Sequence, residues 1–340
     1  MDADLLRLTL NRFGPQALQC AAAVSHEWRT ACRHAIQTRR RDFSLGLEKG
    51  ASIGVDAAGA APGHFFPAAI YIAECVGATA LTRQRLDRAK TVGCDCAAEQ
   101  CGTAACRCCA GSCAYDAHGR LRSLLNKGSS PATCAMPICE CSKGCYCDET
   151  CCNRVVGRGL TSRLTIFWTG DDRGWGVRAA EPLHCGQFVC EYAGEILSSE
   201  EAALRRQRRD TCWRKTGHRP CNYVMTLVEH VGSPSHRRAL QTTIDPTERG
   251  NVGRYLNHAC EPNLELHIVR VGSAVPRAAF FCAREIAKGE ELTFHYGSSG
   301  VPAAGGAGSD DGSKLDAGCR PCRCGAAGCG GFLPFDSSAV

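Results

Sequence analysis

Hydrophobic residues near the start of the chain recur at the spacing of an α-helix. Three of them lie at positions i, i+4 and i+7 and so share one helix face: Leu6, Leu10 and Phe13. A Gly-Pro pair then breaks the pattern, and Pro15 suits the first turn of a new helix. Ser25 can cap a further, basic helix from His26 to Arg41. The pattern predicts a helical segment over residues 1–41.

From residue 153 to residue 297 the helical spacing gives way to short β-type runs with turns between them. Six runs are predicted strands: Leu164–Trp168, Phe188–Tyr192, Asn222–Val228, Leu264–Val271, Ala278–Cys282 and Glu291–Tyr296. One good helix is expected there, Ser199–Gln207, which Ser198 or Ser199 can cap. Residues 42–93 are mixed, with a strand-like piece at Phe65–Ile72. The predicted fold class is α+β, mostly β.

Composition narrows the class of protein further. Of the 340 residues, 44% are hydrophobic, which is enough for a buried core and excludes wholesale disorder. No run of about 18 apolar residues occurs, so we expect no membrane-spanning helix and no membrane partner. The first residues, MDADLLRLTLNR, carry charges throughout, so we expect no secretory signal. Residues 298–318 are rich in Gly, Ala and Ser and predict a flexible linker.

Cysteine is the outlier in this composition. The chain has 27 cysteines, and fourteen of them lie between Cys94 and Cys152. Such a density indicates either a disulfide framework or thiolate ligands for metal. Two cysteines separated by one residue rarely pair with each other, yet they can hold one ion or two adjacent ions. Because this Cys-x-Cys spacing occurs five times, metal is favoured: Cys94/Cys96, Cys106/Cys108, Cys139/Cys141, Cys145/Cys147 and Cys322/Cys324.

Nine of these cysteines form two blocks with regular spacing. The blocks are Cys94, Cys96, Cys101, Cys106 and Cys108, and then Cys141, Cys145, Cys147 and Cys151. Three tetrahedral zinc ions need about twelve ligand positions, which nine thiolates fill if three of them bridge two ions each. The chain between the blocks, with AYDAHGRLRSLL, is expected to loop out. Surplus cysteines leave one-residue alternatives in ligand choice: Cys109, Cys113, Cys134, Cys139 and Cys152.

Three further segments carry candidate chemistry. RGWGVRA, from Arg173 to Ala179, is a predicted turn whose glycines allow close approach of backbone to a ligand. GNVGRYLNHACEPNL, from Gly250 to Leu264, concentrates polar residues in a loop. Such a concentration is costly unless the polar groups have a function. EIAKGEELTFHYG, from Glu285 to Gly297, completes the set.

These segments, in this order and with the cysteine blocks, resemble the SET-domain histone lysine methyltransferases. The second block runs into CNRVVGRGL, which is similar to the pre-SET module of the branch that acts on lysine nine of histone H3. The resemblance implies a SET-domain β-fold with a pseudoknot, flanked by cysteine-rich zinc modules. It implies a helical N-terminal segment (1–41), a pre-SET module (42–155), a SET catalytic domain (156–297), a flexible linker (298–318) and a post-SET module (319–340).

The resemblance also implies roles for particular residues. S-adenosylmethionine is expected against Arg173, Gly174, Trp175, Tyr223, Arg254, Asn257 and His258. Tyr296 matches the catalytic tyrosine, with Tyr223 and Phe294 beside it in the lysine channel. Phe294 occupies the position that sets product multiplicity in the family, and phenylalanine there implies di- and trimethylation. The pseudoknot is expected to bring Asn257 and His258 beside Tyr296.

A fourth zinc is implied near the end of the chain. Cys322, Cys324 and Cys329 leave one tetrahedral position open, and Cys260 matches the family's fourth ligand, with Cys319 as the rival. With 40 basic and 34 acidic residues the formal charge is +6. Thirteen thiolates and four zinc ions would lower it to +1. The charge balance therefore says little about partners.

Two departures from the family pattern bear on partners. His295 stands where the family usually has an acidic residue, which puts peptide-binding details in doubt. Residues 205–219 are more basic than expected, and they are either a DNA contact on a nucleosome or a solvated insert.

The expected partners are a histone tail, most of all that of histone H3, and the nucleosome, in chromatin of the nucleus. Two rival interpretations stay open. One is a zinc-stabilised chromatin-binding module without activity. The other adds a ubiquitin-ligase adaptor contact, because LTLNRFGPQALQCAAAVSHEWRTACR resembles an F-box, although a generic helical hairpin packed on the main domain is the favoured explanation.

Overall fold

The structure is a computed structural model of the chain. It describes residues 6, 9–10, 13–60, 70–96, 101, 106–109, 113–126, 138–217, 221–232, 236, 238–297 and 320–334. The predicted linker 298–318 lies outside these residues, as do Cys134 and Cys319. Within the described ranges, no helix combines the length and the apolar character that crossing a membrane requires.

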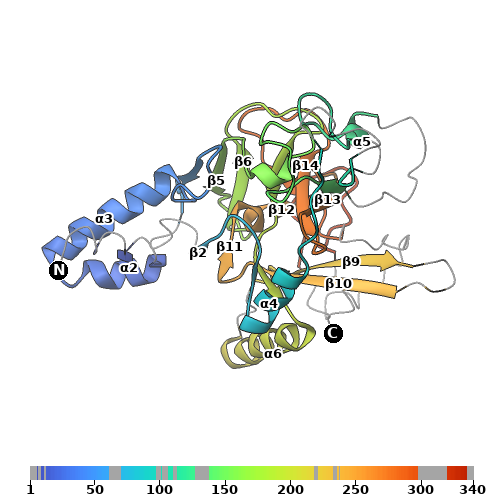
Figure 1. Ribbon diagram of the computed structural model, residues 1–340. Helices are drawn as coiled ribbons and strands as arrows, with labels where there is room; N and C mark the ends of the chain where they lie inside the picture. The colour runs from blue at the N-terminus through green and yellow to red at the C-terminus, as the bar shows by residue number, and fades with distance from the viewer. Residues whose placement is uncertain are drawn as a thin grey trace.

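Two helices form an arm at the start of the chain, on the left in Figure 1: α2 (Pro15–Ala22) and α3 (His26–Arg41). As predicted, α2 begins at Pro15 and Ser25 caps α3, its hydroxyl accepting a hydrogen bond from the Trp28 backbone N–H at 3.2 Å. The buried face of α3 contributes Cys32 and Ala35 to the main core. A helical hairpin packed on the main domain is therefore present, and the F-box resemblance stays a prediction.

Most of the fold consists of three small sheets (Figure 1). In spatial order the first holds β1 (Ile53–Asp56), β5 (Leu164–Trp168) and β6 (Trp175–Ala179). The second holds β3 (Val76–Gly77), β8 (Glu195–Leu197), β10 (Arg238–Asp245) and β9 (Met225–Val231). The third holds β4 (Ile138–Glu140), β13 (Leu264–Val271), β14 (Arg277–Cys282) and β7 (Phe188–Glu191).

Two short parallel pairs connect distant parts of the chain. β2 (Ile70–Tyr71) pairs with β11 (Arg249–Gly250), and β12 (Asn257–His258) pairs with β15 (Thr293–Phe294). The remaining helices are α4 (Ala80–Arg88), α5 (Arg122–Leu125) and α6 (Ser199–Thr216), with 3-10 turns η2 (Val156–Arg158) and η3 (Val252–Tyr255). The mostly β fold with few helices confirms the predicted class.

The main core lies between these layers. Its fully buried members include Ile166 of β5, Val177 of β6, Phe280 of β14 and Leu292 beside β15. Strand pattern explains the packing, because alternate residues of β5 point inward, Leu164 and Ile166 among them. Burial of these apolar side chains is the main favourable contribution to stability.

The segment between the cysteine blocks does not loop out as expected. Tyr115 is fully buried and stacks on Phe281 of β14, with ring centroids 6.2 Å apart. Its hydroxyl donates to the Glu140 carboxylate at 2.5 Å. Leu121 and Leu124 join the same cluster. The expectation was wrong because these apolar side chains cover a sheet face that would otherwise be exposed.

Several predicted boundaries also change. β5 and β13 have the predicted limits, whereas β9 begins at Met225 and only Thr293–Phe294 of the last predicted run is strand. The predicted turn at Trp175 is the start of β6. Helix α6 continues to Thr216 through the basic stretch and ends at Gly217, whose φ of 67° is left-handed. Glycine suits this position, which explains why the helix stops there.

Candidate active site and metal centres

The pairing of β12 with β15 builds the centre of the candidate site. Asn257 lies opposite Thr293 and His258 opposite Phe294, although the two strands are far apart in the chain. The parallel pairing places the residues that follow β15 beside those of β12. The backbone N–H of Tyr296 donates to His258 Nδ1 at 3.1 Å. The structure thus brings together the three residues that the pseudoknot was expected to join.

The hydroxyl and the ring of Tyr296 both contact neighbouring residues. Its hydroxyl donates to the Leu256 carbonyl oxygen at 3.1 Å, and its ring lies 4.9 Å from that of Phe294 and 5.3 Å from that of His258. Desolvation, with a contribution from Tyr223, raises the pKa of Tyr296 above its ordinary value. A hydroxyl that donates to Leu256 can still accept a hydrogen bond from a reactant and so position it.

His258 is neutral in this setting. Burial and then the neighbouring His295 lower its pKa to about 4. Because Nδ1 accepts the Tyr296 N–H, the ring proton is assigned to Nε2. That nitrogen lies 3.5 Å from the Cys260 sulfur. One imidazole therefore contacts both the candidate catalytic tyrosine and a candidate metal ligand.

A polar network that the sequence did not reveal surrounds Asn257. The Glu291 carboxylate accepts from Asn257 Nδ2 at 2.8 Å and from Arg173 Nη1 at 3.0 Å. Asn257 also donates to the Trp175 carbonyl oxygen at 3.4 Å. Gly176 leaves room for these groups, since an added Cβ would lie 3.0 Å from the Glu291 carboxylate. Glu291 thus joins Arg173 and Asn257, two residues that were expected to hold the cofactor.

Arg254 holds the loop behind Tyr223. Its guanidinium donates to the carbonyl oxygens of Pro246 and Thr247, each at 2.8 Å, and lies 4.2 Å from the centroid of the Tyr223 ring. The Tyr192 hydroxyl donates to the Tyr223 carbonyl at 2.5 Å. These contacts position Tyr223, while direct contact of Arg254 with a cofactor stays a prediction.

Phe294 is buried in an aromatic cluster. Its ring centroid lies 4.7 Å from that of Phe280, 4.9 Å from that of Tyr296 and 6.4 Å from that of Tyr192. Of these three neighbouring rings, those of Tyr296 and Tyr192 carry a hydroxyl, and that of Phe280 is apolar. A hydroxyl added at Phe294 would therefore enter an apolar space beside Tyr296.

Asn263 is a second functional residue whose task the sequence left open. Its side chain donates to the Glu290 carboxylate at 3.0 Å and to the Glu291 carbonyl at 2.8 Å, and accepts from the Thr293 N–H at 2.9 Å. This buried amide therefore fixes the segment that enters β15. The density of polar groups in GNVGRYLNHACEPNL was the signal for such a role.

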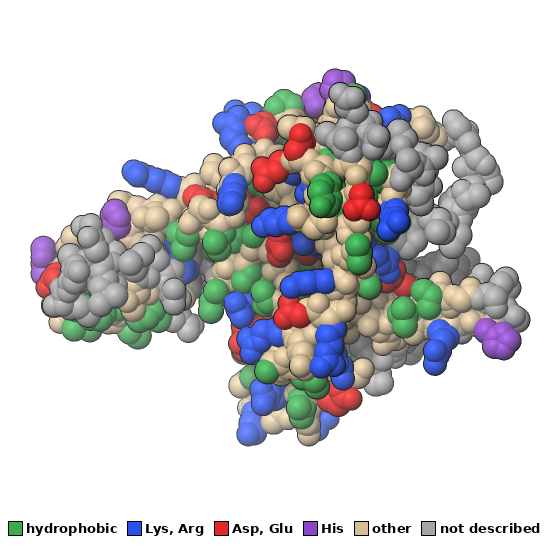
Figure 2. Space-filling model, viewed as in Figure 1, with side chains coloured by type: hydrophobic (Ala, Val, Ile, Leu, Met, Phe, Trp, Pro, Cys, Tyr) green, Lys and Arg blue, Asp and Glu red, His purple; other side chains and the backbone are tan. Residues whose placement is uncertain are grey.

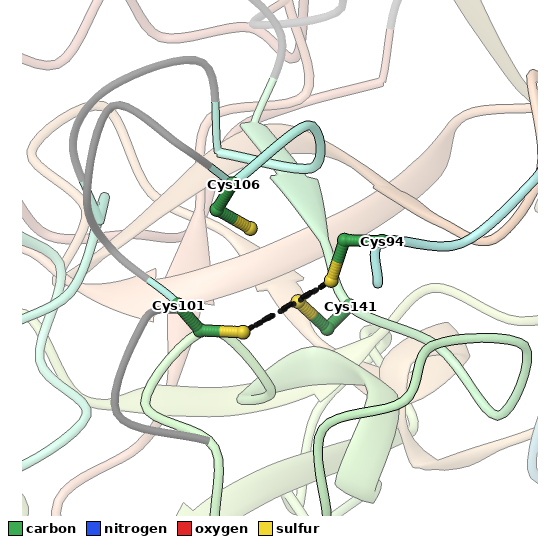
Figure 3. A group of neighbouring side chains, drawn as sticks. All are labelled: Cys94, Cys101, Cys106 and Cys141. Carbon is green, nitrogen blue, oxygen red and sulfur yellow. Dashed lines mark hydrogen bonds between the residues drawn. The ribbon is translucent and has the colours of Figure 1, made fainter. Parts of the chain in front are cut away.

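The nine cysteines of the two blocks gather in one place. Their sulfurs form three overlapping groups within 4.8 Å: Cys94, Cys101, Cys106 and Cys141; Cys94, Cys141, Cys145 and Cys147; Cys101, Cys141, Cys147 and Cys151. Figure 3 shows the first group, with the Cys141 sulfur 3.8 Å from those of Cys94 and Cys101. Cys108 joins through Cys145 at 3.7 Å, and Cys96 packs in the same cluster. Shared members are what bridging thiolates require.

The residues after the second block support these sulfurs. Asn153 Nδ2 lies 3.6 Å from the Cys141 sulfur, and Arg154 Nη2 lies 3.3 Å from that of Cys147. Donors of this kind stabilise thiolates and fix their orientation. The CNRVV segment therefore has a physical task in the cluster, which the spacing of cysteines alone did not reveal.

The surplus cysteines in this region lie at the edge of the cluster. Cys109 packs against it, whereas Cys139 and Cys152 are exposed. The Cys113 sulfur lies 3.7 Å from the Cys152 carbonyl oxygen. Within the described residues, none of these four belongs to a group of sulfurs close enough for a shared ion.

A separate group of four forms at the end of the described chain. The sulfurs of Cys260, Cys322, Cys324 and Cys329 lie within 4.8 Å of one another. Backbone N–H groups, that of Cys260 first, lower the pKa of Cys324 to about 6, which favours the thiolate that metals bind. The group ties the tail to the loop beside His258.

Comparisons with known proteins agree with this geometry. The SET-domain family model matches residues 174–297. Histone-lysine N-methyltransferase SETMAR of Bos taurus is 40% identical over 248 residues, which are 72% of this chain and 75% of that protein. Probable histone-lysine N-methyltransferase set-23 of Caenorhabditis elegans is 36% identical over 253 residues, 73% of this chain and 89% of that protein.

Solved structures show the same fold. The methyltransferase domain of human SETMAR superposes with a TM-score of 0.66 at 31% identity, covering 87% of this chain and 98% of that one. Arabidopsis thaliana SUVH6 in complex with SAM gives 0.60 at 26% identity, over 87% of this chain and 56% of that one. From the fold, the joined motifs and these similarities, the chain belongs to the SET-domain family of histone-lysine N-methyltransferases.

Proposed function

We propose that this enzyme transfers methyl groups from S-adenosylmethionine to lysine nine of histone H3, giving di- and trimethyl products in nuclear chromatin. The observation that carries the proposal is the group around Tyr296, whose ring contacts the rings of both His258 and Phe294. The choice of lysine nine is supported by the resemblance of the pre-SET cysteine blocks and CNRVVGRGL to that branch of the family.

The residues near β12 suit S-adenosylmethionine, the ligand of the similar SUVH6 structure. The Asn257 amide and the Trp175 carbonyl lie together there, 3.4 Å apart, and the Trp168 and Trp175 rings meet edge to face with centroids 5.3 Å apart. Bound there, S-adenosylmethionine would supply a methyl group on a sulfonium that carries its own leaving group. Arg173, Gly174, Trp175, Tyr223, Asn257 and His258 are the proposed holders, with Arg254 behind Tyr223.

The chain's own task is to present a neutral amine in line. Free lysine has a pKa near 10.4, and an apolar channel disfavours its ammonium form. Phe294, Tyr223 and Tyr296 are the proposed walls of this channel. Because the Tyr296 hydroxyl donates to the Leu256 carbonyl, its oxygen orients the amine as a hydrogen-bond acceptor, and the amine loses its proton to solvent before it is enclosed.

Four zinc ions are proposed in the two cysteine centres, three in the first and one in the second. The overlapping groups that share Cys141 support three bridged ions. The group of four sulfurs that includes Cys260 supports the fourth ion. With nine thiolates for three ions and four for one, sulfur would fill every tetrahedral position, so both centres are proposed to be structural. The second centre would fold the tail over the lysine channel through the contact of Cys260 with His258.

A peptide assay tests the substrate. Mass spectrometry of a histone H3 tail peptide should show stepwise methylation of lysine nine, and the same peptide with arginine at that position should stay unmodified. The four core histones, assayed together, serve as the control for substrate choice. Methylation of a different lysine only would contradict the substrate and leave the family assignment intact. No methylation of any histone would favour the chromatin-binding module.

The substitution Phe294→Tyr tests product multiplicity. A hydroxyl beside Tyr296 can hold water or the amine and so prevents a methylated nitrogen from turning its lone pair into line. We expect mainly monomethyl product, with the first transfer changed less than about threefold. A tenfold change in the later steps needs only about 1.4 kcal/mol, within the range of one hydrogen bond.

The course of the product ladder decides this prediction. If Phe294 were ordinary core, overpacking would slow every step alike. A wild-type enzyme that stops at monomethyl lysine, or a variant with an unchanged ladder, would contradict the assignment. Phe281→Tyr is the matched control, because Phe281 is equally buried in the cluster around Tyr115, away from Tyr296.

A further inference from the structure

Helices α4 and α6 start side by side. Strand β3 runs parallel to β8, with Val76 opposite Glu195 and Gly77 opposite Ile196. Each strand leads directly into its helix, which Thr79 caps in α4 and Ser198 in α6. Figure 1 shows both helices together at the lower end of the molecule.

The two helices carry a concentrated positive charge. Between them they have nine basic residues and four acidic ones, a net charge of +5. Two of the acidic residues are occupied locally: Glu201 completes the cap of α6, and Asp87 pairs with Lys90 at 2.9 Å. In Figure 2 basic side chains gather over this part of the surface.

One arginine anchors α6 and the others are available. Arg205 donates to the buried carboxylates of Asp245 and Glu195, each at 2.9 Å, which fixes the helix against β8 and β10. Seven other cations have no ion pair or side-chain hydrogen bond with any described residue: Arg83, Arg88, Arg206, Arg208, Arg209, Arg214 and Lys215. None of the residues of α6 is buried.

A helix whose residues are all exposed or only partly buried gains little stability from packing, so an external partner accounts better for its composition. Its large exposed apolar residues are only Leu204 and Trp213, too few for a membrane-facing side. Arginines spread over two adjacent helices suit a repeated anionic backbone, because each guanidinium can bind a phosphate through two N–H groups. We propose that α4 and α6 form a binding surface for the phosphate backbone of double-stranded DNA.

The position of the surface gives it a function in the proposed reaction on histones, on which this step rests. Helix α6 ends at Thr216, a few residues before Tyr223 in the proposed lysine channel. A histone tail leaves the nucleosome beside DNA. Binding that DNA through α4 and α6 would raise the local concentration of the tail and favour nucleosomes over free peptide.

Binding to a short DNA duplex of random sequence, measured by fluorescence anisotropy over a series of salt concentrations, tests the surface directly. The variant replaces Arg208 and Arg214, both exposed, by glutamine (R208Q, R214Q). Two lost phosphate contacts should weaken binding about tenfold and reduce the slope of log K against log salt by about 2. The matched control makes the same change on another basic helix, at the exposed Arg33 and Arg41 of α3 (R33Q, R41Q). It should bind DNA as the wild type does.

Unchanged DNA binding and slope in the α6 variant would overturn the proposal, as would a loss confined to the α3 control. Displacement of DNA by polyglutamate at equal charge would point to an acidic protein partner instead, and it too would overturn it. Turnover on nucleosomes should fall with DNA affinity, while turnover on H3 peptide stays constant. Because binding is measured without methylation, an inactive wild type that still binds DNA through α6 would contradict the proposed function alone.

Discussion

Tyr296→Phe should lower the turnover number by about 100-fold or more while cofactor affinity changes less than about threefold. The substitution removes one oxygen and keeps the aromatic contacts with Phe294 and His258. It also keeps the backbone bond from Tyr296 to His258, which needs no side chain. The lost bond to the Leu256 carbonyl should cost about 1 kcal/mol of stability. Steady-state kinetics on H3 peptide and calorimetry of S-adenosylmethionine binding measure the two effects.

Two further variants test this prediction. Tyr146→Phe is the matched control, since Tyr146 is 85% exposed, and its turnover should equal that of the wild type. His258→Ala should weaken cofactor binding first, because His258 belongs to the proposed cofactor wall and supports Tyr296 only through its backbone. The opposite pattern, with cofactor binding lost in Tyr296→Phe and turnover alone lost in His258→Ala, would mean that the two roles are exchanged.

Removal of zinc should have the largest effect on stability. The wild type is expected to contain four zinc ions, and chelation should abolish activity. Cys141 belongs to all three overlapping groups, so Cys141→Ser removes a sulfur from the centre of the cluster. Serine keeps the shape but supplies a poor ligand. Because metal binding supplies much of the folding free energy of such modules, we expect a loss of more than about 4 kcal/mol of unfolding free energy.

The cysteines offer graded controls for the zinc prediction. Cys151 belongs to one group only, so Cys151→Ser should lose less zinc than Cys141→Ser. Cys139 lies on the same strand, β4, but is exposed, and Cys139→Ser should keep four ions and wild-type stability. Elemental analysis and thermal unfolding measure both. A wild type with one zinc or none, or equal losses in all three variants, would contradict a shared cluster.

Much of the local structure could be predicted because its causes lie within a few residues. The cap at Ser25, the helix start at Pro15 and the limits of β5 and β13 depend on side-chain period and on hydrogen bonds to nearby backbone. The end of α6 was missed because a basic, polar run has no apolar period, whereas helix propensity and the cap at Gly217 carry the helix onward.

Ligand types could also be predicted, but their grouping could not. Cys-x-Cys spacing indicates thiolate ligands by itself, since two cysteines separated by one residue can present both sulfurs to one ion. Which sulfurs share an ion depends on contacts such as Cys94 with Cys141, 47 residues apart, and Cys260 with Cys322, 62 apart. The spacing of cysteines in the sequence does not predict contacts over such separations. For Cys260, the family resemblance predicted the grouping.

The sequence alone determined the chemistry available to this protein: thirteen candidate thiolates, one tyrosine in a recognisable motif, and short strands with caps and turns. The tertiary structure decided which residues contact these groups. Glu291 accepts a hydrogen bond from Arg173, which is 118 residues away in the chain. Tyr115 stacks on Phe281 instead of lying in a loop that points away from the fold. The physical reason is range. Periodicity and capping act over one or two turns, whereas long contacts form only when many segments bury apolar surface together, and no single segment encodes that outcome.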